Sequence, residues 1–150
     1  VEILAACDLA IAADDAEFGL SEPRVGLAAL GGGALQRLAR ELPMKEAMWL
    51  VLRAQRIGAE EARRIGLVNK VVPRAELMIQ ARALADELLA CAPLALQASK
   101  QVMLQSLEEP DFAKAMTRRY EAAERMLASE DAIEGPRAFA EKRKPHWKGR

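Results

Sequence analysis

The sequence predicts a mixed α/β protein whose strands lie in the first half and whose second half is helical. Two short apolar runs near the N-terminus, residues 9–13 (LAIAA) and 16–20 (AEFGL), have strand character and are joined by a polar turn. From residue 74 onward, apolar residues recur every three to four positions, as they do on one face of a helix. Because two or three strands make a marginal sheet, we expect these strands to belong to a larger one.

The other elements of the first half follow from local signals. Residues 2–7 (EILAAC) have helical composition, and residues 36–54 predict two helices that Pro43 separates. Residues 57–66 (IGAEEARRIG) predict a compact helix that starts and stops at glycines. Residues 67–73 (LVNKVVP) then predict a short strand that ends at a proline.

The second half predicts four helices. Residues 74–89 form a long one with a single buried stripe. That stripe consists of Leu77, Ala81, Leu84 and Leu88. A second helix opens at Pro93, because proline is well tolerated in a first helical turn. A third long helix spans residues 111–128, and residues 129–131 (SED) cap a last short one.

Composition excludes several classes of function. A chain of 150 residues, 51% hydrophobic and 29% charged, can form one ordinary globular domain or part of a larger one. Its formal net charge of zero gives no electrostatic reason to bind nucleic acid or an anionic membrane. The longest apolar runs, such as residues 9–13 and 48–52, are far shorter than a membrane span. We therefore expect a cytoplasmic protein with no nucleic-acid partner and no membrane contact.

Cysteine and histidine give no sign of a metal site. Cys7 and Cys91 lie far apart without metal-ligand spacing, and His146 is the single histidine. We expect no bound metal and no disulfide framework, with both cysteines buried as small hydrophobic side chains.

Other residues have ordinary interpretations. Gly31 to Gly33 could form a phosphate loop, but no lysine followed by serine or threonine comes next, so a turn or pocket wall is favoured. Trp49 and Trp147 are expected in core and surface packing. The basic residues 142–144 (KRK) are expected to form a solvated tail.

One glutamate, Glu22, stands between an apolar run with strand character and the glycine-rich residues 29–34 (ALGGGA). Glutamates are rarely buried unless paired, so a solvated turn would be the ordinary explanation. Further segments change that interpretation, and they occur in a fixed order along the chain. They are EILAACDLAIAADDAEFGLSEPRVGL, QRL, RIGAEEARRIGLVNKVVP, APLALQASK and SEDAIEGPRAFAEKRKP.

In order and spacing these segments resemble the crotonase family of enoyl-CoA hydratases and isomerases, over essentially the whole chain. The match begins about halfway along a typical member. The resemblance therefore implies the C-terminal part of a crotonase-like (ClpP-like) ββα spiral of the α/β class, followed by a helical trimerisation region. It divides the chain into a core part, residues 1–73, and a helical oligomerisation region, residues 74–150. The expected assembly is a homotrimer or a dimer of trimers.

The resemblance implies two catalytic carboxylates, Glu2 and Glu22. Glu2 would activate water for addition at Cβ of an acyl-CoA thioester, and Glu22 would protonate Cα. No cofactor is expected beyond the coenzyme A thioester that forms the substrate. The backbone N–H groups that polarise the thioester oxygen are expected from a glycine just before Val1 and from the upstream half. The implied substrate contacts are Leu20, Gly26, Leu30, Gly31, Phe139 and Lys142.

The loop GLAALGGGALQRL departs from the usual family pattern, since it lacks a proline and a threonine and is one residue longer. Acyl specificity therefore stays open, and a dehydratase for a branched or substituted acyl-CoA is as compatible as a fatty-acid hydratase. Glutamate at both positions favours water addition or removal over isomerisation. The alternative from another class is a catalytically incomplete fragment that acts only as an oligomerising or interaction module.

Overall fold

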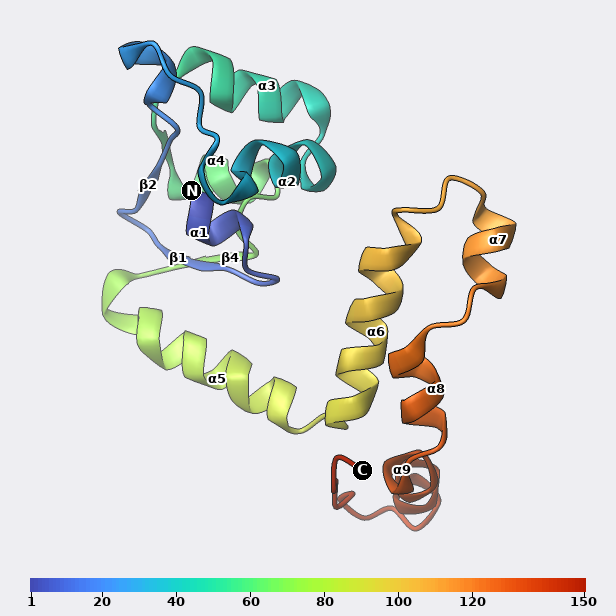
Figure 1. Cartoon of the computed structure of the whole chain (residues 1–150). Coiled ribbons are helices and arrows are strands. Elements are labelled where there is room, and N and C mark those ends of the chain that lie inside the picture. The colour runs from blue at the N-terminus through green and yellow to red at the C-terminus, as the bar shows by residue number, and fades with distance from the viewer. The chain divides into compact units, whose positions relative to one another are not determined.

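The computed structural model describes all residues from Val1 to Arg150, which form two compact units, Val1–Ala83 and Leu84–Arg150 (Figure 1). The division falls inside helix α5 (Leu77–Leu89), ten residues beyond the boundary expected at residue 73. No helix in either unit is both long enough and apolar enough to cross a membrane.

The first unit combines four short strands with helices. Its elements in chain order are α1 (Glu2–Ala5), β1 (Ile11–Ala13), β2 (Glu17–Phe18), η1 (Glu22–Val25), η2 (Gly31–Gly33), α2 (Ala34–Glu41), α3 (Met44–Arg53), β3 (Ile57–Gly58), α4 (Ala59–Arg64), β4 (Lys70–Val72) and η3 (Arg74–Glu76). The predicted break between α2 and α3 is confirmed. Leu42 is extended (φ −104°, ψ 153°), as the residue before a proline prefers to be.

The strands pair across the unit and not with their sequence neighbours. Strand β1 is parallel to β4, with Ile11 opposite Lys70, and β2 is antiparallel to β3, with Glu17 opposite Gly58. The two apolar runs near the N-terminus therefore belong to different sheets. Strand β3, which sequence patterns did not predict, supplies the partner for β2. A parallel pair such as β1 and β4 needs a long crossover, and helices α2 to α4 lie within it.

The core of the first unit lies between the strands and helices α1 to α4. Leu38 in α2 is 1% exposed and Ala62 in α4 is fully buried, and both pack in one cluster with Leu50 of α3. Leu20 joins the same cluster at 2% exposure. The burial of Leu20 fixes the chain two residues before Glu22.

The second unit is helical, with α6 (Pro93–Ser106), α7 (Phe112–Thr117), α8 (Glu121–Leu127) and α9 (Glu130–Ala140). Helices α6 and α8 pack side by side (Figure 1). The predicted helix starts at Pro93, Asp111 and Ser129 are confirmed. The side chain of Asp111 accepts the backbone N–H of Ala113 at 2.9 Å, and Ser129 Oγ accepts that of Ala132 at 3.2 Å.

The prediction of one long helix over residues 111–128 is wrong, because the chain breaks between α7 and α8. Arg118 is extended (φ −61°, ψ 140°), and Tyr120 is buried with its hydroxyl donating to the Ala115 carbonyl at 2.8 Å. Burying this aromatic ring and satisfying its hydroxyl turns the backbone away from the helical path.

Two further burial predictions are also wrong. No residue of α5 is fully buried, although Leu77, Ala81 and Leu84 of the predicted stripe are half-buried. Cys7 and Cys91 are exposed, since each lies just beyond the C-terminal end of a helix. Each Sγ instead donates to the carbonyl four residues earlier, at 3.3 Å for Cys7 and 3.6 Å for Cys91.

Candidate active site

Glu2 opens helix α1, and its carboxylate lies against the glycine loop η2. A Cβ atom built on Gly31 would stand 2.6 Å from Glu2 Oε1 and 3.3 Å from Oε2. Real Cβ atoms essentially never come that close to another atom, so a side chain at Gly31 would displace the carboxylate. The structure thus brings together two of the predicted site residues, Glu2 and Gly31. The close approach explains why the loop carries glycine at this position.

Glu22 is the first residue of η1, a single 3₁₀ turn. Pro23 fits the start of the turn, and Gly26 ends it in the left-handed conformation (φ 78°) that glycine adopts without strain. The carbonyl of Glu22 accepts the N–H of Leu27 at 3.1 Å. The side chain is half-buried, and Oε2 is fully buried without a hydrogen-bond partner. Glu22 therefore does not behave as a glutamate in a solvated turn.

An unpartnered carboxylate oxygen in the interior is unusual. Buried polar atoms almost always have a hydrogen-bond partner, because losing water without replacement costs free energy. Among buried side-chain nitrogen and oxygen atoms, Glu22 Oε2 is the one without a partner. This arrangement suits a carboxyl group whose partner is a reactant.

The other predicted substrate contacts fall in three settings. Gly26 faces open space, and Leu30 is 71% exposed in the loop before Gly31. Leu20 instead belongs to the core. Phe139, 87% exposed, and Lys142, in the left-handed conformation (φ 53°), belong to the second unit, whereas the two glutamates belong to the first.

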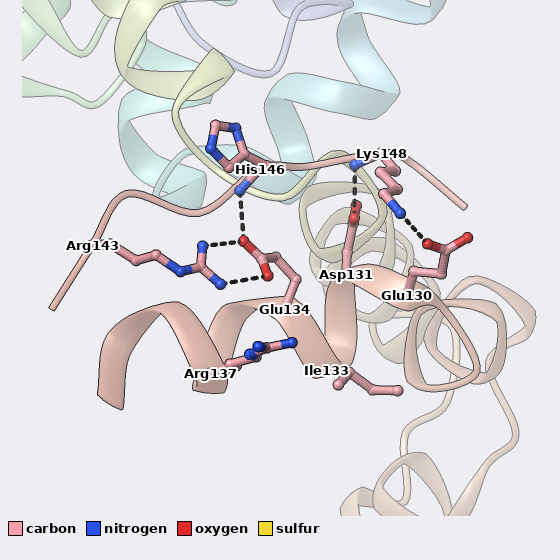
Figure 2. A pocket seen from close by; sticks show the side chains of 8 residues that line it. All are labelled: Glu130, Asp131, Ile133, Glu134, Arg137, Arg143, His146 and Lys148. Atoms are coloured by element: carbon pink, nitrogen blue, oxygen red, sulfur yellow. Dashed lines mark hydrogen bonds and ion pairs between the residues drawn. The ribbon is translucent and has the colours of Figure 1, made fainter. Parts of the chain in front are cut away.

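The second unit contains a pocket of about 570 Å³ between α9 and the C-terminal segment (Figure 2). Arg143 donates to both carboxylate oxygens of Glu134, at 2.6 and 2.9 Å, and Lys148 pairs with Glu130 at 2.5 Å. Asp131, 4% exposed, accepts the backbone N–H of Lys148 at 2.7 Å. These charges compensate one another and fasten the C-terminal segment to α9.

The same contacts correct the expectation of a solvated basic tail at Arg143, whereas Lys142 and Lys144 are exposed as expected. Arg143 pairs with Glu134 and also with Glu141 at 2.6 Å, so it is part of the fold. Its hydrogen bond, together with the backbone N–H of His146, lowers the pKa of Glu134 to about 2. The two tryptophans, which were expected in core and surface packing, lie in different surroundings. Trp147 Nε1 donates a hydrogen bond to the Ala90 carbonyl at 2.8 Å, whereas Trp49 is 57% exposed.

A second, apolar pocket of about 350 Å³ lies along α3. Its lining side chains are Met44, Lys45, Met48, Trp49, Leu52 and Arg53. Its ionisable side chains are Lys45 and Arg53, and no carboxylate, histidine or cysteine lines it, so it offers no carboxylate pair for the expected chemistry. No group of three or more histidine, cysteine, aspartate or glutamate side chains is placed to hold a metal ion.

One residue near the site makes a contact that no sequence pattern predicted. Arg24, two positions after Glu22, donates from Nε to the carbonyl of Ala54 at 2.7 Å. Ala54 closes α3 in the left-handed conformation (φ 48°, ψ 36°), which is uncommon for a residue with a side chain. An arginine in a loop is ordinarily solvated, and its distant partner is visible only once the chain is folded.

Comparison with known proteins supports the family suggested by the sequence. The family model described as enoyl-CoA hydratase/isomerase matches residues 1–150. Carnitinyl-CoA dehydratase from Escherichia coli (strain K12) is 44% identical over 155 aligned residues, which cover 99% of this chain and 58% of that protein. The chain thus spans little more than half the length of this curated relative.

Solved structures support the same family. The crystal structure of an enoyl-CoA hydratase from Mycobacterium tuberculosis H37Rv superposes with a TM-score of 0.90 and 37% identity, covering 97% of this chain and 57% of that one. A Novosphingobium aromaticivorans protein described as a short-chain enoyl-CoA hydratase gives a TM-score of 0.88 and 44% identity, covering 97% and 57%. The fold is therefore the α/β crotonase fold, and the chain belongs to the enoyl-CoA hydratase/isomerase family.

Proposed function

We propose that this protein adds or removes water across the α,β-bond of an acyl-CoA thioester, with Glu2 and Glu22 as its acid–base pair. The observation that carries the proposal is the buried, unpartnered Oε2 of Glu22 in a chain of this family. A carboxyl oxygen kept from water and from protein donors is free to exchange a proton with a reactant.

The chemistry divides between the two carboxyl groups. In hydration, Glu2 accepts a proton from water as the water oxygen bonds to Cβ, and the π electrons of the double bond move to Cα. Cα then takes a proton from the carboxylic acid of Glu22, so the elements of water are added. Proton exchange with solvent afterwards returns Glu2 to the carboxylate and Glu22 to the acid, and no other reactant is needed. Dehydration runs the same steps backwards. The reaction needs one of the two groups ionised, to accept a proton, and the other protonated, to donate one.

The loop around the site supports an apolar substrate. Leu27 and Leu30 are 66% and 71% exposed, on the stretch that joins η1 to η2. Gly31 has no side chain and so leaves room for the Glu2 carboxylate beside the loop. We propose that Gly26, Leu30 and Gly31 contact the acyl group and that Leu20 supports this wall from the core. No cofactor is required beyond coenzyme A as the thioester carrier.

The relatives guide the choice of substrate. The E. coli relative is named a carnitinyl-CoA dehydratase and the M. tuberculosis relative an enoyl-CoA hydratase. We propose a hydratase or dehydratase that acts on a short or substituted acyl-CoA in cytoplasmic fatty-acid metabolism. Isomerisation is less well supported, because both positions carry glutamate.

We also propose that the protein assembles as a homotrimer or a dimer of trimers, with Phe139 and Lys142 at a substrate contact. The second unit exposes several large apolar side chains, as oligomeric proteins do at their interfaces. They include Met103 (70%), Leu107 (70%), Phe112 (76%), Met116 (70%) and Leu127 (71%). Light scattering on the purified protein would give the mass of the assembly.

The same exposed surface favours the second candidate function, an oligomerising module without catalysis. An assay of enoyl-CoA hydration distinguishes the enzyme from the module without catalysis. Purified protein would be given a short trans-2-enoyl-CoA, and loss of the conjugated thioester absorbance would be followed for the wild type, Glu22→Gln and Glu2→Gln. Glu121→Gln, an exposed glutamate of α8 in the second unit, is the control. A folded wild type that neither hydrates enoyl-CoA nor dehydrates 3-hydroxyacyl-CoA would favour the module.

A further inference from the structure

The turn that carries Glu22 is held in place by Arg24. Residues of a single 3₁₀ turn have few backbone bonds of their own, and the turn η1 bends at two special residues, Pro23 and Gly26. Within the turn, the N–H of Arg24 reaches the carbonyl of Ser21 at 3.0 Å. These local bonds shape the turn but do not fix where it lies in the unit.

The bond from Arg24 to Ala54 supplies that fixation. Arg24 Nε donates to the Ala54 carbonyl at 2.7 Å, and the bond is partly buried. This carbonyl stands at the C-terminal end of α3, where helix carbonyls lack intrahelical partners and carry the negative end of the helix dipole. A guanidinium group is a fitting donor there, because a charge-assisted hydrogen bond is stronger than a neutral one.

The acceptor is itself held rigidly. Ala54 is 7% exposed and left-handed (φ 48°), a conformation that persists in a residue with a side chain only where its surroundings dictate it. The next two residues, Gln55 and Arg56, pack tightly against Gly19, which lies between β2 and Glu22. A Cβ atom on Gly19 would stand 3.2 Å from the Gln55 carbonyl oxygen and 3.2 Å from Arg56 Cγ.

Two anchors therefore lie on either side of Glu22. Leu20, two residues before it, is buried in the core, and Arg24, two residues after it, is bonded to the end of α3. We propose that Arg24 is a positioning residue for Glu22: its hydrogen bond to Ala54 holds the turn so that the carboxyl group faces the reactant. This inference rests on the proposed function.

Two substitutions separate the hydrogen bond from the charge. In glutamine, Nε2 occupies the place along the side chain that Nε occupies in arginine, so Arg24→Gln keeps the donor and removes the charge. In methionine that place is a methyl group, so Arg24→Met keeps the side chain as far as the Nε position, as glutamine does, and removes both the donor and the charge. Arg63→Met is the matched control, because Arg63 is an exposed arginine of α4 that pairs only locally, with Glu60 at 3.1 Å.

The first readout is the kinetics of enoyl-CoA hydration. Because a misplacement of about 1 Å can cost about a hundredfold in rate, Arg24→Met is expected to lower kcat by about 10- to 100-fold while KM changes by less than about threefold. Arg24→Gln is expected to restore most of kcat. A kcat for Arg24→Met equal to that of Arg63→Met would overturn the inference, and so would equal losses in the methionine and glutamine variants.

The second readout does not depend on activity. The amide of Leu27, which donates to the Glu22 carbonyl, reports on the turn through hydrogen exchange. Its exchange should be faster in Arg24→Met and unchanged in Arg24→Gln and Arg63→Met. Unchanged exchange in Arg24→Met would contradict the positioning role. If Glu22→Gln keeps full activity while Arg24→Met shows the faster exchange, then Glu22 is not catalytic, but the Arg24 hydrogen bond still holds the turn.

Discussion

Replacing Gly31 by alanine tests the contact that holds the Glu2 carboxylate. The new Cβ would lie 2.6 Å from Glu2 Oε1, whereas ordinary contacts begin at 3.4 Å, so the carboxylate must move by about 0.8 Å. Gly31 itself does not have a positive φ, and the substitution adds no strain from a left-handed backbone. The steric effect therefore falls on the end of the Glu2 side chain.

The expected effect on stability is small and the effect on catalysis is large. Pushing the flexible Glu2 side chain off its preferred rotamer costs about 1 kcal/mol, and for a protein of this size that lowers Tm by about 2 to 4 °C. Because a displacement near 1 Å can cost about a hundredfold in rate, kcat should fall by about 10- to 100-fold. Both values come from hydration kinetics and thermal unfolding of the same preparation.

A matched control is Gly58→Ala. A Cβ atom on Gly58 has nothing within 4 Å, and its backbone is extended (φ −75°, ψ 172°). Equal kcat values for Gly31→Ala and Gly58→Ala would refute the reasoning. A double variant sharpens the test: in a Glu2→Ala background, Gly31→Ala should cause no further loss of rate, since the colliding group is gone.

Three more outcomes are expected. Asp131→Ala removes the acceptor of two backbone N–H groups of the C-terminal segment, at 2.7 and 2.9 Å, and should lower the free energy of unfolding in denaturant by about 2 kcal/mol; an unchanged midpoint would contradict this. The folded pKa of Glu134, about 2, lies below its ordinary 4.5, because Arg143 donates to it. Its stabilising contribution is therefore present above about pH 5 and lost as the pH falls toward 2, so Glu134→Gln should destabilise the protein at pH 7 and much less at pH 3; a pH-independent difference would be the contrary result. Cys7 and Cys91 should both react with a thiol reagent in the native protein, since both are exposed, and reaction only after denaturation would disagree.

Local chemistry was sufficient to predict most helix boundaries. Pro93 cannot donate a backbone N–H and so suits a first helical turn, while Asp111 and Ser129 accept N–H groups that a helix start leaves free. These signals act within three or four residues, and the structure agrees with each. The same holds for Pro43, which separates α2 from α3.

The structural features that the sequence did not indicate depend on contacts between residues far apart in the chain. The break before α8 depends on burying Tyr120, and no glycine or proline marks it. Pairing of β2 with β3 depends on where α3 ends, at the left-handed Ala54. The exposure of Cys7 and Cys91 depends on their positions after helix ends, whereas cysteine as a residue type is usually buried.

In the candidate site, too, some features were indicated by the sequence and others are seen only in the folded chain. The position of Glu22 between a strand-like run and a glycine loop made it a candidate site residue. That its Oε2 is buried without a hydrogen-bond partner is visible only in the folded chain. The contact between Glu2 and Gly31 and the bond from Arg24 to Ala54 join residues far apart in the sequence. Residue types therefore indicated the chemistry, and tertiary contacts indicated how the groups are held.

The most direct test of the acid–base assignment is the rate at which the protein and its Glu22→Gln variant hydrate a short trans-2-enoyl-CoA, with circular dichroism to verify that both are folded. General acid–base groups contribute about 10²- to 10⁴-fold to a rate, and the variant is expected to lose activity within that range while its spectrum stays unchanged. A folded Glu22→Gln variant that hydrates the substrate at the wild-type rate would contradict the assignment.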